Sequence, residues 1–100
     1  AWYKFYAYVV PASLRPGWDR DRVAAAINAE GIPCMAGSCS EIYREQAFVA
    51  AGFGPSRPHP AARLLGDTSL MFLVHPTLDE GDMRDAAAAV ARVMAAAVCP

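Results

Sequence analysis

The sequence lacks an excess of charge of either sign. Its 100 residues include nine Lys and Arg side chains against ten Asp and Glu, which gives a net charge of -1 at pH 7. The two signs are interspersed along the chain. A domain that binds nucleic acid or an acidic membrane surface usually carries a clear basic patch. The sequence therefore predicts no nucleic-acid partner and no membrane partner.

Long hydrophobic runs and a dense cysteine pattern are also missing. No stretch approaches the roughly 20 apolar residues that a membrane-spanning helix needs, and the start, AWYKFYAYVV, does not have the order of a signal peptide. The three cysteines are too few and odd in number for a secreted disulfide scaffold. These absences predict a cytoplasmic protein. The abrupt strand-like start at Ala1, without an initiator methionine, suggests a piece of a longer chain.

Familiar catalytic motifs are absent as well. The sequence has no G-x-G-x-x-G, no P-loop and no H-E-x-x-H. Cys34 and Cys39 have no histidine near them in the sequence, because His59 and His75 lie far along the chain, so no metal site is predicted. A nucleophilic Cys39 stays open as an alternative, since it needs a histidine base that is close in space rather than in sequence.

What is present is an alternation of strand-like and helix-like segments. Aromatic, β-branched and apolar runs predict strands at residues 2–10, 32–36 and 69–74. Helical patterns cover residues 19–30, 41–51, 60–65 and the C-terminal part from residue 77, and residues 52–60 form a loop. The order βαβααβα predicts one α+β domain over residues 1–100, with a small three-stranded, mostly antiparallel sheet and helices packed mainly on one face. The first strand is expected to be mostly buried and 69–74 to be the central strand.

Local signals predict where two of these helices begin and which side of the last helix is buried. Asp19 has the character of an N-cap, and Gly31 fits the left-handed position after the helix end. Thr77 with Glu80 has the spacing of a capping box for the last helix. That helix shows an apolar stripe with steps of four and three, formed by Met83, Ala87, Val90, Met94 and Ala97.

The segment GSCSE, residues 37–41, has the composition of a loop that lines a site. Gly37 permits a close backbone approach, and Ser38, Cys39 and Ser40 offer short polar groups. Glu41 is expected to begin a helix whose free N–H groups favour an anion. The alternative is an ordinary strand-to-helix turn in which Ser38 or Ser40 is the N-cap. Cys34 is expected to be a small buried apolar residue.

Three segments resemble one protein family: YKFYAYV (3–9), WDRDRVAAAINAEGIPCMAGSCSEIYREQAF (18–48) and TSLMFLVHPTLDEGDM (68–83). They are similar to the C-terminal small domain of the DegT/DnrJ/EryC1/StrS aminotransferases, which are pyridoxal-phosphate (PLP) enzymes of fold type I. The resemblance implies transfer of an amino group from glutamate to a nucleotide-linked keto-sugar, in polysaccharide or antibiotic biosynthesis. It also implies a homodimeric parent protein and a large N-terminal domain that holds the PLP cofactor and its lysine.

The resemblance places these residues on the substrate side of the active site and implies no catalytic residue among them. Many members carry a His-Tyr pair about where this chain has Gly37-Ser38, so the usual substrate contact is altered here. The lone lysine, Lys4, does not match the family's S-x-x-x-K context, so this segment alone is expected to be inactive and to bind no PLP. The candidate substrate-binding residues are Ser38, Cys39, Ser40, Glu41 and Tyr43, with Tyr3 and Lys4 as second choices.

Three of these candidate residues have a purely structural alternative. Tyr43 could be a packed helix aromatic, Tyr3 a residue of the strand core, and Lys4 a surface cation whose stem covers apolar side chains.

A different function also stays open for the whole chain. A free-standing α+β domain of this size could be a ligand-binding or regulatory module.

Overall fold

The sheet is three-stranded and antiparallel. In the computed structural model, which describes residues 3–100, the strands lie in the order β1-β3-β2. They are β1 (Lys4–Tyr8), β2 (Cys34–Ala36) and β3 (Ser69–Leu73). The predictions of an α+β fold and of a central third strand are confirmed. The first two strands are shorter than predicted, and Trp2 lies outside the described residues.

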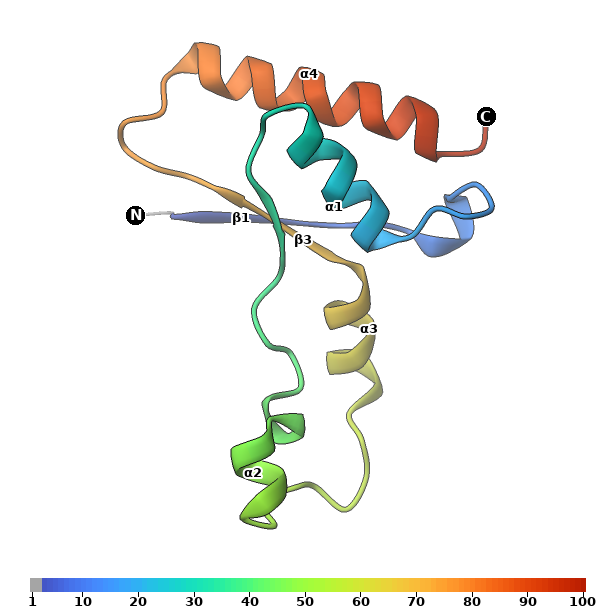
Figure 1. Ribbon diagram of the computed structural model, residues 1–100, viewed down its shortest axis with the longest axis vertical. Helices are drawn as coiled ribbons and strands as arrows, with labels where there is room; N and C mark the ends of the chain where they lie inside the picture. Colours follow the sequence, from blue (N-terminus) through green and yellow to red (C-terminus); the bar gives the residue numbers. More distant parts are fainter. Residues whose placement is uncertain (1–2) are drawn as a thin grey trace.

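The helices divide into two groups (Figure 1). α1 (Arg20–Ala29) and α4 (Glu80–Ala97) cover one face of the sheet, as predicted. α2 (Gln46–Ala50) and α3 (Pro60–Thr68) belong to a segment that extends away from the other side. We call this segment, residues 37–68, the arm. No helix within residues 3–100 is both long and apolar enough to cross a membrane.

The core lies between the sheet and the pair α1 and α4. Asp19 caps α1 by accepting a hydrogen bond of 2.7 Å from the N–H of Arg22, and Gly31 has φ 88° after the helix end, both as predicted. Val23 and Ile27, four residues apart on α1, are fully buried. The other buried members of the core are Val9, Cys34, Leu70, Val93 and Ala97. Cys34 is therefore a buried apolar residue, as predicted.

The start of α4 differs from the prediction. Asp79, not Thr77, is the N-cap, and it forms the capping box with Asp82 through bonds of 3.0 and 2.9 Å. Thr77 is engaged elsewhere, because its hydroxyl shares a 2.8 Å hydrogen bond with Nδ1 of His75 in the preceding turn. Asp is at least as good an N-cap residue as Thr. The N-cap of α4 therefore lies two residues later than predicted.

The buried side of α4 also differs from the predicted stripe. Ala97 is buried, and Val90 and Met94 pack against the core, but Met83 and Ala87 are exposed. The first turns of α4 extend past α1 (Figure 1), in agreement with the exposure of Met83 and Ala87. The buried residues of the helix are instead Ala89, Val93 and Ala97.

The prediction that β1 is mostly buried is wrong within this chain. Phe5, Tyr6 and Tyr8 on this strand are exposed, as is Tyr3 just before it. β1 is an edge strand, and within residues 3–100 helices cover only one face of the sheet. Aromatic composition reports strand propensity but cannot say whether a second layer covers the strand.

The helix predicted for residues 41–51 is broken in two. Residues Ile42–Arg44 form a 3-10 turn, η2, and α2 begins only at Gln46, because Glu45 is extended (φ -62°, ψ 141°). Glu41 therefore does not begin an α-helix, and the predicted anion-binding helix N-terminus is absent. By contrast, α3 begins at Pro60 as predicted and continues three residues further, to Thr68.

Candidate functional site

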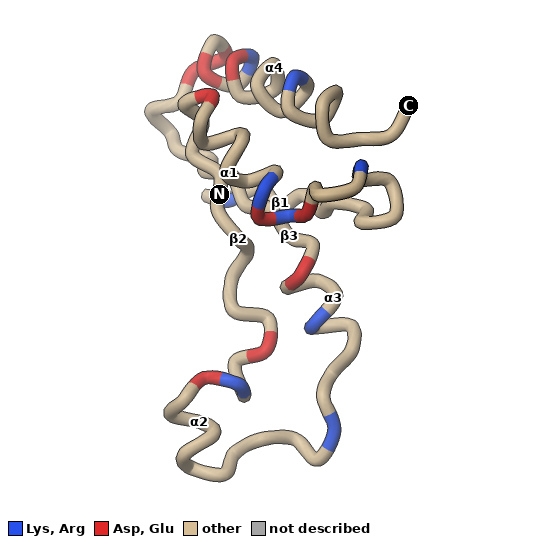
Figure 2. Tube along the Cα trace, turned by 45° about the vertical axis from the view of Figure 1, so that its right-hand side comes forward, with Lys and Arg blue, Asp and Glu red and all other residues tan. Residues whose placement is uncertain are grey.

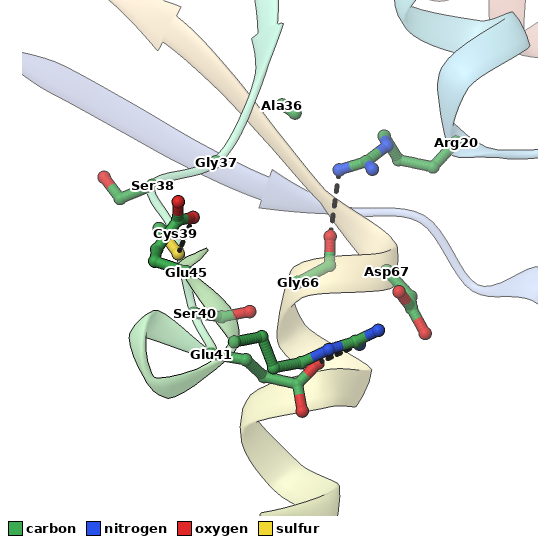
Figure 3. A pocket seen from close by; sticks show the side chains of 11 residues that line it. Arg20, Ala36, Gly37, Ser38, Cys39, Ser40, Glu41, Glu45, Gly66 and Asp67 are labelled. Atoms are coloured by element: carbon green, nitrogen blue, oxygen red, sulfur yellow. Dashed lines mark hydrogen bonds and ion pairs between the residues drawn. The ribbon is translucent and has the colours of Figure 1, made fainter. Parts of the chain in front are cut away.

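An open depression of about 310 Å³ lies where the arm joins the sheet (Figure 3). The loop after β2 forms one wall, and the end of α3 with Gly66 and Asp67 forms the opposite wall. The side chain of Arg20, from the first turn of α1, reaches in from the helix layer. Four predicted site residues line the depression together: Ser38, Cys39, Ser40 and Glu41.

Two glycines allow the walls to approach each other. The N–H of Gly37 donates to Oγ of Ser69 over 3.2 Å, and a Cβ on Gly37 would lie 2.3 Å from that oxygen. A Cβ on Gly66 would lie 2.2 Å from Oγ of Ser40. The prediction that Gly37 permits a close approach is confirmed, but the approaching group belongs to β3 of the same chain.

Arg20 holds the junction together and was not found from the sequence. Its Nη1 donates to the carbonyls of Gly66 (2.9 Å) and Ser69 (3.0 Å), and its Nε bonds Asp21 (2.6 Å). The side chain is only 16% exposed. These carbonyls lie at the end of α3, where helix carbonyls lack partners within the helix and a cation is favourable. The two residues whose carbonyls it binds are over 40 positions away, and no local pattern marks such a contact.

The thiol of Cys39 is paired with a carboxylate. Its Sγ donates a 3.3 Å hydrogen bond to Oε1 of Glu45. This carboxylate raises the pKa of the Cys39 thiol, so less thiolate is present near neutral pH. The alternative of a thiol enzyme predicts a lowered pKa for this thiol, and the contact with Glu45 acts in the opposite direction. Ser38, next to Cys39, shares a 2.8 Å hydrogen bond with the hydroxyl of Tyr6 on β1.

We expect Cys39 to react slowly with iodoacetamide near pH 8, and Glu45→Gln to make it react faster. The substitution removes the negative charge that disfavours the thiolate. The measurement is the alkylation rate of each cysteine by peptide mass spectrometry, with the exposed Cys99 as the internal reference. A rate for Cys39 that is unchanged in Glu45→Gln would contradict this assignment.

Tyr43 and Glu41 form a structural cluster in the arm. The Tyr43 hydroxyl donates to Oε1 of Glu41 over 2.5 Å and accepts from the N–H of His59 over 3.1 Å. Its ring also meets the His59 ring edge-on, with 5.5 Å between centroids. Oε2 of Glu41 pairs with Arg44 at 3.0 Å. The cluster ties the two limbs of the arm together. Tyr43 thus makes structural contacts, but from the 3-10 turn η2 and not from a packed α-helix as the structural alternative had it.

The cluster makes the stability of the arm depend on pH. The Tyr43 hydroxyl, and after it the Arg44 guanidinium, hold the pKa of Glu41 below its usual value. A lowered folded-state pKa stabilises the fold above the unfolded-state pKa, and this contribution is lost as pH falls through the folded-state pKa. We therefore expect Glu41→Gln to lower the melting temperature at pH 6 and to have a much smaller effect at pH 3. Equal effects at both pH values would contradict the pairing.

Tyr3 and Lys4 lie apart from the other candidates. Lys4 pairs with Leu73 at one end of β3, whereas the loop after β2 begins beside Leu70, near the other end. Three strand positions separate these ends, which is roughly 10 Å. Lys4 lies over the Tyr3 ring, with 5.3 Å from Nζ to the centroid. The structure thus brings Ser38, Cys39, Ser40 and Glu41 together and leaves Tyr3 and Lys4 elsewhere.

Within residues 3–100, no cluster of three or more His, Cys, Asp or Glu side chains could hold a metal ion.

Comparison with known proteins relates the chain to a solved structure. No protein-family model and no curated protein matches the chain. Among solved structures, the chain is similar to an aminotransferase from Psychrobacter cryohalolentis, with 46% sequence identity and a TM-score of 0.88. The match covers 93% of this chain and 24% of that chain, so this chain spans about a quarter of its neighbour. Over nearly its whole length, the chain is therefore similar to one part of that aminotransferase.

Proposed function

We propose that this chain is the C-terminal small domain of a PLP-dependent aminotransferase of the DegT/DnrJ/EryC1/StrS family, which acts on a nucleotide-linked keto-sugar. The observation that carries the proposal is the 46% identity to an aminotransferase across 93% of the chain. The resemblance of residues 3–9, 18–48 and 68–83 to that family supports the narrower assignment. The parent protein would be a cytoplasmic homodimer, in which a large domain of the same chain supplies the rest of the active site.

In this proposal the depression forms the substrate-side wall of the active site. Ser38 and Ser40 offer hydroxyls, and the Cys39 thiol stays neutral as a weak hydrogen-bond donor. Glu41 is only 11% exposed and is already paired with Arg44 and Tyr43. Its role, and that of Tyr43, is to shape the wall. Tyr3 and Lys4 could meet only a distant part of an extended substrate.

The residues of this chain do not fit a PLP site. PLP, when bound, carries the amino group between donor and acceptor, and PLP enzymes hold it through a lysine amine. Lys4 is the one lysine in the sequence, and its position at the other end of β3 keeps it away from the depression. The proposal therefore assigns the cofactor to the large domain and leaves binding and shaping of the substrate site to these residues.

The test is to treat the full-length protein that contains this chain with PLP and then borohydride, and to map the reduced adduct by peptide mass spectrometry. We expect one modified lysine, outside residues 1–100, and an unmodified Lys4. An adduct on Lys4 would contradict the division of roles. The absence of any adduct would contradict the aminotransferase assignment and favour a ligand-binding module.

A further inference from the structure

Most charged side chains around the depression are already paired within the chain. They are two arginines and three carboxylates, namely Arg20, Arg44, Glu41, Glu45 and Asp67. Arg20 binds two backbone carbonyls, and Arg44 pairs with Glu41 at 3.0 Å. Asp67 lies 3.6 Å from Arg63, one helical turn away on α3. Both arginines of the depression are therefore engaged by groups of the chain itself.

Glu45 differs from the other carboxylates of the depression. Within residues 3–100 it forms no ion pair. The break between η2 and α2 lies at this residue, and Figure 3 shows its carboxylate beside Cys39. Its Oε1 accepts the 3.3 Å hydrogen bond from the Cys39 thiol, and no other side chain of residues 3–100 donates to this carboxylate. A carboxylate can accept several hydrogen bonds, so Oε2 is available to a ligand.

Ser40 supplies a second available polar group. Its hydroxyl points across the depression toward the end of α3 (Figure 3). Gly66 leaves room for it there, since a Cβ on that glycine would lie 2.2 Å from the Ser40 Oγ. A serine hydroxyl can both donate and accept a hydrogen bond. The Ser38 hydroxyl, by contrast, is already bonded to Tyr6. The depression thus offers a carboxylate oxygen and one hydroxyl.

These groups favour an uncharged ligand that carries hydrogen-bond donors. An ionised carboxylate only accepts hydrogen bonds, so the group that meets Glu45 must be a donor such as a hydroxyl or an amide N–H. A phosphate needs cations or donors around it, and the negative charge of Glu45 would repel it. Both limbs of the arm carry positive and negative side chains, and Figure 2 shows no run of one sign on either limb. The electrostatics therefore disfavour a diphosphate in the depression.

We propose that Glu45 is a specificity-determining residue, whose Oε2 accepts a hydrogen bond from a hydroxyl or amide N–H on the sugar part of the substrate. The Ser40 hydroxyl provides the second contact to the same sugar. This inference rests on the proposed function, which supplies a nucleotide-linked sugar. It adds that this wall meets the sugar and not the diphosphate. It also adds Glu45, which is not among the residues predicted from the sequence.

The test compares the full-length protein with its Glu45→Gln variant. Dissociation constants are measured by isothermal titration calorimetry for UDP, dTDP and GDP, and for the glucose conjugate of each nucleotide. We expect Glu45→Gln to weaken binding of the glucose conjugates by about tenfold, because a hydrogen bond to a charged acceptor is replaced by one to a neutral amide. Binding of the nucleoside diphosphates should not change, because the diphosphate lies outside the depression.

Glu80→Gln is the matched control, because it neutralises an exposed carboxylate on α4, and it should change neither set of constants. The inference is overturned if Glu45→Gln affects both kinds of ligand alike. Tighter binding of both would place the diphosphate beside Glu45, and unchanged binding of both would show that Glu45 makes no contact. Either result in a protein that forms the borohydride adduct would leave the proposed function intact. A protein that binds none of these ligands and forms no adduct would reject the proposed function and the inference with it.

Discussion

Gly37→Ala is expected to destabilise the domain by about 1–3 kcal/mol, the usual cost of overpacking. The new Cβ would lie 2.3 Å from Oγ and 2.9 Å from Cβ of Ser69. Ser69 is only 5% exposed, so the serine cannot move aside freely. Rotating its hydroxyl would relieve the shorter contact but not the one to Cβ, and it would break the hydrogen bond from the Gly37 N–H.

The measurement is thermal unfolding, in which each kcal/mol lowers the melting temperature by roughly 4–8 °C for a domain of this size. Gly54→Ala is the matched control, because no atom lies within 4 Å of a Cβ built there. The double variant Gly37→Ala with Ser69→Gly should recover much of the loss, since it removes the clashing side chain. The steric account fails if Gly37→Ala melts at the same temperature as Gly54→Ala.

Arg20→Ala is expected to cost about 2 kcal/mol, in the range for hydrogen bonds to a charged group. The substitution leaves the carbonyls of Gly66 and Ser69 without the bonds of 2.9 and 3.0 Å that they now accept. It also removes the cation at the C-terminal end of α3. We expect the root of the arm to loosen, with faster hydrogen exchange at the end of α3.

Arg84→Ala is the control for this prediction. Arg84 makes a single exposed pair with Glu80 at 3.1 Å, and such pairs contribute about 0.5 kcal/mol or less. Arg20→Lys should recover only part of the stability, because an ammonium group lacks the planar fork that reaches two carbonyls. Equal melting temperatures for Arg20→Ala and Arg84→Ala would show that the junction does not depend on this guanidinium.

Much of the fold was predictable because its signals are local. Asp19 and Pro60 mark the starts of α1 and α3 through the chemistry of the first helical turn. The apolar run at residues 69–74 correctly predicts the central strand. One error arises where two local solutions compete. Thr77 and Asp79 are both good N-caps, and the bond from Thr77 to His75 decides in favour of Asp79.

The candidate site was predictable only in part, because its geometry depends on contacts that are distant in sequence. The small residues of the loop at 37–40 indicated a close approach, and the structure confirms it at Gly37. The partner of that approach, Ser69, and the anchoring residue, Arg20, lie more than 15 positions away in sequence. Similarly, the exposure of β1 depends on whether a second layer covers the sheet, and no periodicity in the strand itself reports that.

The most direct test of the central claim is the visible absorbance of the full-length protein before and after addition of glutamate. If this chain is the small domain of a PLP-dependent aminotransferase, the purified protein is yellow. Glutamate then replaces the yellow band with that of the pyridoxamine form. A colourless protein that gains no such band when PLP is supplied would contradict the claim.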